Sequence, residues 1–370
     1  MAENNGMMDE QAEIITTGMT EDVTDKKCPN CGATVVYDPE TLAMTCPFCG
    51  YSRQLPKPDD NGQDVEECDF SSATNRESLD WGKEKKSLVC KNCGAETIMD
   101  SADTAQCCPY CGSTQVMPVD NDENVVAPGG VVPFEISKEK AAELFKSWMK
   151  GKLFAPTEAK KSCEAKNFNG VYLPYWTYDS QTTSPYMVKL GFDSKDKDGN
   201  VHTTYRTYTG IYERFIDDET VYASKKTNNP YIKQASTFDF TKLRKYSPEF
   251  IAGFLAERYT IGLDEGWDIA KGQIKTKLES EIGSMEKKRH HADSVSKVMF
   301  NTSYAKVTYK YVLAPIWIAN FKFKEKLYNI VINGQSGQIR GQSPVSPAKV
   351  AIFIAILVAV FAAIWYFLNH

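Results

Sequence analysis

The sequence predicts an α+β protein with two small four-cysteine zinc ribbons, a mixed domain of antiparallel sheet and helices, and a C-terminal transmembrane helix. Three observations predict this class. Cysteine pairs recur at metal-ligand spacing, helix-like and strand-like apolar patterns alternate after residue 128, and the final stretch of the chain is apolar and uncharged. With 370 residues, the chain is long enough to bury a sizeable core.

Charge divides the chain into two halves. Residues 1–127 contain 24 acidic and 9 basic residues, a balance of −15, whereas residues 128–370 contain 24 acidic and 34 basic residues, a balance of +10. We expect phosphate backbones to repel the acidic half and anionic lipid headgroups to attract the basic half.

Composition and spacing define seven segments. They are a disordered acidic tail at 1–27, zinc ribbon 1 at 28–50, an acidic linker at 51–87, zinc ribbon 2 at 88–117, an α+β domain at 128–341, a spacer at 342–349 and a transmembrane helix at 350–368. The tail is polar and lacks apolar periodicity, which is typical of disorder. The linker is rich in Pro, Asp, Glu and Ser, and we predict a short helix in it near Trp81.

Eight of the 11 cysteines form four C-x-x-C pairs. The first set is Cys28, Cys31, Cys46 and Cys49, and the second set is Cys90, Cys93, Cys108 and Cys111. Four thiolates on two tight turns suit tetrahedral Zn²⁺, and the glycine after each pair allows the turn under the sulfurs. We therefore predict two Zn²⁺ per chain, with rubredoxin-like iron and redox dithiols as the alternatives. Four thiolates leave no open coordination position, so these sites are structural.

Three cysteines lie outside this pattern. Cys107 could compete as a ligand, although only the neighbouring Cys108 keeps the spacing of the first set. Cys68 and Cys163 have no partner in the sequence, and we expect ordinary buried or free thiols. Metal-ligand spacing in place of a disulfide framework indicates a reducing compartment.

The α+β domain contains three predicted helices. Ser137 caps the first, which carries an apolar stripe and ends at Gly151. Ser247-Pro248 predicts the start of a second helix over Glu249–Tyr259. A third helix runs from about Glu265, with one apolar face formed by Trp267, Ala270, Ile274, Leu278, Ile282 and Met285.

Strands surround these helices. Residues 170–180 predict one strand, and Tyr186–Phe192 with Val201–Thr209 predict a hairpin. A second hairpin is predicted over 321–332, followed by a turn at Asn333-Gly334. The run Ala314-Pro315-Ile316-Trp317 echoes Leu173-Pro174-Tyr175-Trp176, which indicates either a second internal repeat or a coincidence.

No catalytic constellation is recognisable. The sequence lacks a phosphate-binding loop, a dinucleotide fingerprint, a zinc-protease motif and a nucleophile elbow, so we predict no enzyme activity. Asp193, Asp196 and Asp198 lack the spacing of a calcium loop and predict a solvated turn. His290 and His291 follow a basic run and point apart on a helix, so we expect both on the surface.

The C-terminal stretch Val350–Leu368 predicts a single membrane-spanning helix. Its 19 uncharged residues would form a helix of about 28 Å, close to the roughly 30 Å hydrocarbon core of a bilayer. A buried core helix is the alternative. Because zinc-binding thiolates need a reducing compartment, we expect the N-terminal bulk of the chain in the cytoplasm and the helix in the cell membrane.

The chain resembles a family on five motifs: the paired CPxCG-type ribbons, SPEFIAGFLAERY, the LPYWTYD and APIW strands, YNIVINGQSGQIRG and the terminal anchor. These are similar to bacterial zinc-ribbon (TFIIB-type ribbon) membrane proteins that are associated with phage-shock protein A and SPFH modules and are often labelled primosomal helicase-like. The resemblance implies a membrane adaptor in the envelope-stress response with phage-shock or SPFH-type protein partners. The sequence contains no nucleotide-binding motif to support the helicase label.

These observations predict an interaction protein with two zinc ribbons on a mobile acidic N-terminal segment, set apart from a basic domain near the bilayer. The alternative is nucleic-acid binding through the ribbons, as in transcription-factor ribbons. The balance of −15 in the ribbon half argues against nucleic acid, because such modules present basic patches.

Overall fold

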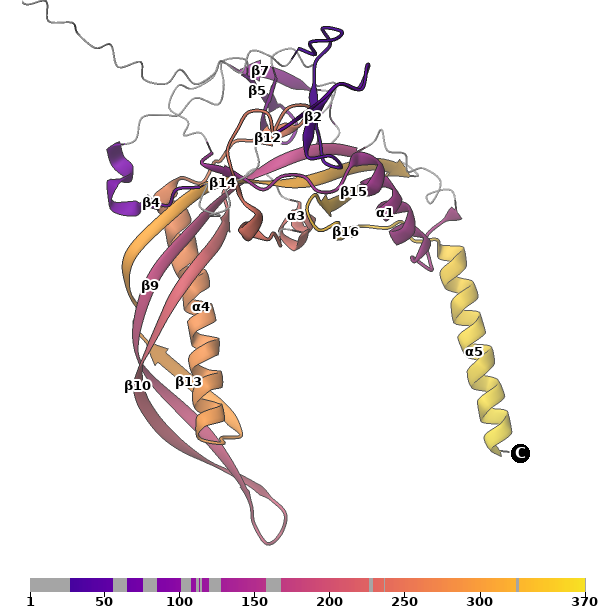
Figure 1. Ribbon diagram of the computed structural model, residues 1–370. Helices are drawn as coiled ribbons and strands as arrows, with labels where there is room; N and C mark the ends of the chain where they lie inside the picture. The colour runs from indigo at the N-terminus through magenta and orange to yellow at the C-terminus, as the bar shows by residue number, and fades with distance from the viewer. Residues whose placement is uncertain are drawn as a thin grey trace, which may run out of the picture.

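A computed structural model describes residues 27–55, 65–75, 85–100, 108–110, 113, 115–119, 128–157, 168–225, 229–235, 237–323 and 326–369. The α+β class is confirmed: a mixed sheet, helices and a C-terminal apolar helix are present. Figure 1 shows an arch, in which a curved sheet joins two legs. One leg is α5 (Pro347–Asn369), and the other is α4 (Leu263–Arg289) lying along long strands.

The strands form two sheets. The smaller sheet has the order β1 (Val36–Asp38), β2 (Ala43–Thr45) and β3 (Ser52–Gln54). The larger sheet has 13 strands: β4 (Cys68–Asp69), β5 (Lys85–Cys90), β6 (Glu96–Asp100), β7 (Val116–Val119), β8 (Gly130–Val131), β9 (Phe168–Lys195), β10 (Val201–Tyr222), β11 (Arg244–Lys245), β12 (Leu255–Glu257), β13 (Ser294–Phe300), β14 (Ser303–Phe323), β15 (Lys326–Asn333) and β16 (Ile339–Gly341). The remaining described helices are α1 (Lys138–Lys150), α3 (Pro230–Ala235) and the 3-10 turns η1 (Phe70–Asn75) and η3 (Phe240–Lys242).

Strand β9 is the spine of the larger sheet, and it pairs with β10, β13 and β14. Its 28 residues join the predicted strand at 170–180 to the predicted hairpin in one continuous element. In the polar run between them, Thr182 and Ser184 are buried, and the run is paired across strands. Thr182 Oγ1 donates to the Arg214 carbonyl at 2.7 Å, and Ser184 Oγ lies 2.8 Å from Thr302 Oγ1.

The outer part of this sheet forms a projection that we call the arm. It comprises residues 180–195 of β9, residues 201–216 of β10, strand β13 and helix α4. The predicted apolar face of α4 is confirmed, because Trp267, Ala270, Ile274, Leu278 and Ile282 are all buried. We call the rest of the larger sheet apart from β5, β6 and β7, with residues 138–157 and α3, the body.

The arm leaves the body at a cluster of charges around buried Lys310 and Asp179. Lys310 Nζ lies 2.9 Å from Asp218 Oδ1, 3.4 Å from Glu67 Oε1 and 3.6 Å from Asp179 Oδ2. Both neighbours of β9 have irregular register here, where Asp218 and Lys306 adopt positive φ angles of 48° and 51°. These β-bulges on both sides of β9 bend the sheet at this point.

The predicted helix over Glu249–Tyr259 is wrong. The chain makes successive turns there that are closed by hydrogen bonds between residues three apart, such as Phe254 N–H to the Ile251 carbonyl at 3.1 Å. It then continues as β12. Gly253 has a φ of +83°, which ends any helical run. The ring of Phe254 stacks on Phe134 with centroids 4.4 Å apart, so tertiary packing outweighs local helix propensity.

The echo between Leu173–Trp176 and Ala314–Trp317 is a structural repeat. The two runs meet at their first residues in the antiparallel β9–β14 pair, where Leu173 is opposite Ala314. Each motif also fixes the next hairpin in the same way. Ala223 N–H donates to the Pro174 carbonyl at 2.9 Å, and Gly334 N–H donates to the Pro315 carbonyl at 2.8 Å.

The segments before the two motifs repeat as well. Strand β8 pairs in parallel with β14, with Gly130 opposite Val312, and β12 pairs in parallel with β9, with Leu255 opposite Val171. The buried residues of α1 are Ala141, Ala142, Phe145 and Met149, and buried residues of α4 lie 125 positions further on: Gly266, Trp267, Ala270 and Ile274. The larger sheet and its helices therefore contain two copies of one strand–helix–hairpin unit, β8–α1–β9–β10 and β12–α4–β14–β15.

Candidate metal centres and membrane-spanning helix

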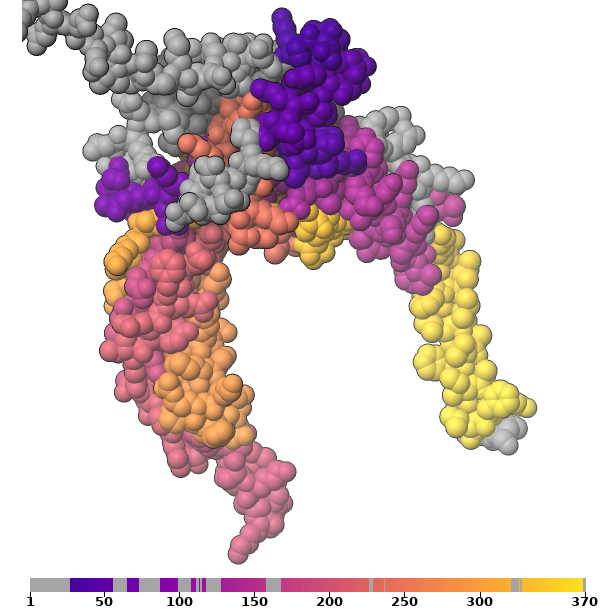
Figure 2. Space-filling model, in the orientation of Figure 1, coloured from indigo at the N-terminus to yellow at the C-terminus, as the bar shows by residue number. Residues whose placement is uncertain are grey.

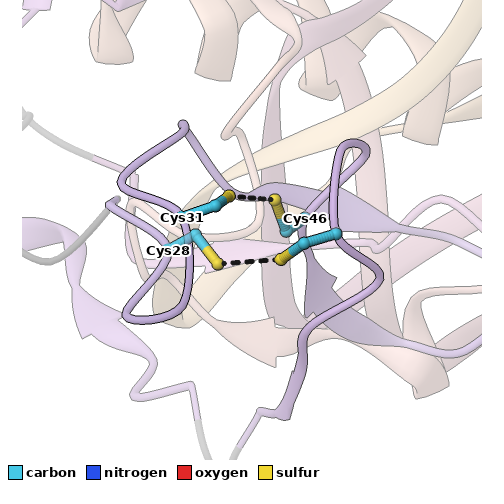
Figure 3. A group of neighbouring side chains, drawn as sticks. Cys28, Cys31 and Cys46 are labelled. Atoms are coloured by element: carbon cyan, nitrogen blue, oxygen red, sulfur yellow. Dashed lines mark hydrogen bonds between the residues drawn. The ribbon is translucent and has the colours of Figure 1, made fainter.

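The first cysteine set converges on one point. The sulfurs of Cys28, Cys31, Cys46 and Cys49 lie within 4.8 Å of one another. Figure 3 shows the two C-x-x-C turns facing each other; Cys28 Sγ lies 3.3 Å from Cys49 Sγ, and Cys31 Sγ lies 3.5 Å from Cys46 Sγ. Sulfurs around tetrahedral zinc would be about 3.8 Å apart, given Zn–S bonds of about 2.3 Å. The four thiols fit a metal ion better than a disulfide, whose sulfurs would be about 2.05 Å apart.

The backbone builds the same turn at each described C-x-x-C. Gly32 N–H donates to the Cys28 carbonyl at 2.8 Å, and Gly50 and Gly94 repeat this bond to Cys46 and Cys90 at 3.0 and 2.8 Å. These three glycines have φ angles of 71°, 72° and 75°. Glycine is favoured there because other residues are strained at positive φ.

Electrostatics in the first set favour a bound cation. Burial raises the pKa of Cys46, but hydrogen bonds from the backbone N–H groups of Cys49 and Phe48 outweigh it and lower the pKa to about 7. For Cys49 the backbone N–H of Tyr51 lowers the pKa, yet the neighbouring thiols raise it to about 12. The Cys46 thiol ionises readily, whereas the neighbouring thiols oppose ionisation of Cys49. A bound positive ion is therefore needed for all four thiols to ionise.

The second set is partly described. The sulfurs of Cys90, Cys93 and Cys108 lie within 4.8 Å of one another, and Cys93 Sγ is 3.6 Å from Cys108 Sγ. Cys111, the predicted fourth ligand, lies outside the described residues, as do Cys107 and Cys163. Two cysteine clusters that could hold metal ions are therefore present, one with four and one with three described thiols.

The first ribbon lies against the body. Tyr37 is buried, and its hydroxyl donates to the Phe134 carbonyl at 3.3 Å. Ser137, the N-cap of α1, donates to Glu40 Oε1 at 2.7 Å, while its oxygen accepts the Lys140 N–H at 3.2 Å. The expectation that the ribbons stand apart from the domain is therefore wrong for this ribbon.

The second ribbon extends the larger sheet. Its strand β6 pairs with β12, with Ile98 opposite Ala256. The buried carboxylate of Glu257 accepts hydrogen bonds from Tyr110 at 2.7 Å, Tyr222 at 2.8 Å and Ser224 at 2.5 Å. This ribbon is thus held by sheet hydrogen bonds and by a buried anion with three hydroxyl donors.

The other predicted positions are placed as follows. Asp196 accepts the backbone N–H groups of Asp198 and Asn200 at 2.9 and 2.8 Å, so Asp196 and Asp198 lie in a turn as predicted, whereas Asp193 lies in strand β9. His291 is exposed, and the side chain of His290 is 29% exposed, with its ring stacked on Tyr208 at a centroid distance of 3.7 Å. The helix predicted near Trp81 lies outside the described residues.

Helix α5 is long and apolar enough to cross a membrane, by length and composition. Side chains from Ala351 to Leu368 are exposed, so α5 is not a core helix of the described molecule. Among the described residues, the start of α5 contacts the body. Lys349 Nζ donates to the Ala155 carbonyl at 2.7 Å, and the rings of Phe353 and Phe154 are 5.3 Å apart. Figure 2 shows the remainder projecting freely.

No sequence signal marks Tyr37, Tyr110 and Glu257, which hold the ribbons on the body. Their partners come from distant parts of the chain, and neither periodicity nor motif spacing connects them. The one available hint is composition, since a glutamate within an apolar run such as Phe254–Tyr259 needs hydrogen-bond donors when it is buried.

Comparison with known proteins gives one relative of similar length. The chain is 28% identical over 344 residues to a Bacillus subtilis (strain 168) protein named uncharacterized protein YdjG, and the match covers 89% of this chain and 92% of that protein. No protein-family model matches the chain, and no solved structure matches it. The similarity therefore extends over most of both chains without indicating an activity.

Proposed function

We propose that this protein is a zinc-binding, membrane-anchored adaptor that presents two zinc ribbons to other proteins at the cytoplasmic face of a bacterial cell membrane. The observation that carries the proposal is the convergence of four thiols within 4.8 Å in a chain that ends in an exposed apolar helix. Four thiolates close the coordination sphere of Zn²⁺, so the metal contributes shape and stability and offers no open position for catalysis.

The packing of the ribbons supports a scaffold role. Each ribbon has its own contacts with the body, through Tyr37 for the first and Glu257 for the second. A partner would therefore meet ribbons and body as one surface. The resemblance to zinc-ribbon membrane proteins indicates phage-shock protein A or SPFH-type proteins as partners and the envelope-stress response as the setting.

Membrane insertion places one requirement on the arch. Figure 1 shows α5 and the arm extending to the same side of the body, and the far end of α4 carries Lys287, Lys288 and Arg289. Charged side chains in the hydrocarbon core cost about 2.5 to 3.5 kcal/mol each. When α5 spans the bilayer, residues 342–346, the part of the spacer before α5, must therefore turn α5 away from the arm.

Fractionation of cells tests the proposal. The full chain is expected in membranes together with a phage-shock or SPFH-type protein, and deletion of Val350–Leu368 is expected to move the chain to the soluble fraction and reduce membrane recruitment of that partner. A correctly folded full chain that recovers no such partner under several envelope stresses would argue against the adaptor role. Tight DNA binding with a steep salt dependence would favour nucleic-acid binding instead.

A further inference from the structure

Among the strands that the structure describes, none pairs with the outer edge of β10 in the arm. Within the arm, β9 is the central strand, with β10 on one side and β13 on the other. In the described part of the chain, β10 pairs with β9 alone. Regular pairing runs from Val201 to Ile216, where the bulge before Glu219 interrupts it. The backbone donors and acceptors on the outer side of these residues are therefore available to another strand.

The two faces of β10 differ sharply. Tyr208 stacks on His290 and Tyr212 donates to Glu281 at 3.2 Å, so the even-numbered side chains face α4. Odd-numbered side chains point away from α4, because successive residues of a strand alternate. They include Tyr205, Ile211 and Phe215, which are 51%, 67% and 55% exposed.

Asp193 and Lys195 lie on this outer face at the tip of the arm, and the rest of the face is apolar or neutral apart from Lys189, Lys297 and Glu213. Met187 and Met299 are paired across β9 and β13, and both are more than 40% exposed. Lys189 Nζ lies 4.8 Å from the Tyr205 ring centroid, and Lys189 is paired with Lys297. Glu213 is the one charged side chain that points outward from residues 203–215 of β10.

Exposed sheet edges are usually protected by proline, lysine, bulges or short length. Residues 201–216 contain neither proline nor lysine, and their regular pairing is unbroken. Threonine, tyrosine and isoleucine dominate this stretch, and these residues favour strand pairing. An edge of this length and composition is therefore expected to be covered.

We propose that a second copy of this chain covers it, with two β10 strands pairing antiparallel and Thr209 opposite Thr209. An antiparallel pair of identical strands uses the whole edge 201–216 when its centre lies at residue 208 or 209, and the choice of 209 sets opposite charges near each other. It places Glu213 of one copy opposite Tyr205 of the other, beside the Lys189 ammonium. The contact occurs twice across the two-fold axis.

This register satisfies the remaining charges as well. Arg206 would lie opposite Tyr212, and Arg214 would lie opposite Thr204, so no two like charges meet. A centre at residue 210 would instead set Arg206 against Arg214. The two outer faces join into one continuous surface, which buries Ile211 beside Thr207 of the second copy.

Light scattering of the purified full chain in detergent tests the pairing. A dimer is expected, and Ile211→Lys is expected to raise its dissociation constant at least tenfold, because a lysine on the paired face resists burial. Glu213→Lys should do the same, and Glu213→Lys combined with Lys189→Glu should restore most of the affinity. These side chains are exposed, so thermal unfolding monitored by circular dichroism serves as the folding control.

Disulfide trapping tests the register independently. With zinc present, Thr209→Cys is expected to form a covalent dimer under mild oxidation, whereas Thr203→Cys is not, because it would face Phe215 of the second copy. The unsubstituted chain gives the background from native cysteines. A monomeric full chain at tens of micromolar overturns the proposal, as does a dimer that is unaffected by Ile211→Lys and is not trapped at Thr209.

Discussion

The indole N–H groups of Trp176 and Trp317 make equivalent hydrogen bonds. Trp176 Nε1 donates to the Ile261 carbonyl and Trp317 Nε1 donates to the Ile136 carbonyl, both at 2.8 Å. Each acceptor belongs to the residue immediately before a helix N-cap, which is Gly262 for α4 and Ser137 for α1. The repeat therefore crosses over, since the hairpin of each unit positions the helix of the other unit.

This equivalence predicts that substituting either tryptophan lowers the free energy of unfolding by the same amount. Trp176→Phe and Trp317→Phe each remove one buried donor and leave a carbonyl unpaired, so each is expected to cost about 1 to 3 kcal/mol. Thermal or denaturant unfolding of the full chain in detergent measures this. Trp365→Phe is the matched control in the exposed helix α5, with an expected change within about 0.5 kcal/mol. A large loss in only one of the two body variants would contradict the equivalence.

Zinc content tests the two metal centres separately. Elemental analysis of the full chain, purified without chelators, is expected to find about two Zn²⁺ per chain. Cys28→Ser and Cys90→Ser should each lose about one, because three thiolates bind the ion far more weakly than four. Cys68→Ser is the control and should retain both. Iron in place of zinc would support the rubredoxin-like alternative, and near-zero metal would exclude both.

Sequence alone predicts the local features of this fold well. Periodicity locates α1 and α4, capping by Ser137 locates the start of α1, and C-x-x-C spacing brings together the first cysteine set. Prediction from sequence fails where contacts between distant segments determine the local structure. The Glu249–Tyr259 run has helix propensity, but Phe254 stacks on Phe134 and the chain extends to pair with β9. Ribbon docking through Glu257 is equally non-local, and no spacing rule connects that residue to Tyr110.

The anchorage of the second ribbon should depend strongly on Glu257. Glu257→Gln replaces one acceptor oxygen with an amide donor that faces hydroxyl groups, so we expect a loss of about 1 to 3 kcal/mol. Amide hydrogen exchange should also accelerate in β6, the strand that pairs beside it. The control is Glu249→Gln, which removes a salt bridge to the half-exposed Arg53 and should cost about 0.5 kcal/mol or less. Equal effects of the two substitutions would contradict the role of buried Glu257 in holding the second ribbon.

Asp179 gives the junction between body and arm a pH dependence. Burial raises its pKa to about 6, the neighbouring carboxylates of Asp218 and Glu67 add to this, and the Asp218 N–H and Lys310 oppose it. An aspartate in the unfolded chain has a pKa near 3.9. The folded pKa is the higher one, so the ionised carboxylate destabilises the fold above about pH 6, and this penalty disappears as the pH falls toward 4.

Asp179→Asn is therefore expected to remove one pH-dependent contribution to the free energy of unfolding. In the unsubstituted chain, this residue should contribute about 1 to 3 kcal/mol of added stability as the pH falls from about 6 to 4. Denaturant unfolding at closely spaced pH values measures the slope, and the variant should be flatter by that amount. Asp193→Asn, at an exposed position near the tip of the arm, is the control and should leave the slope unchanged. If both variants keep the slope of the unsubstituted chain, Asp179 does not titrate in this range.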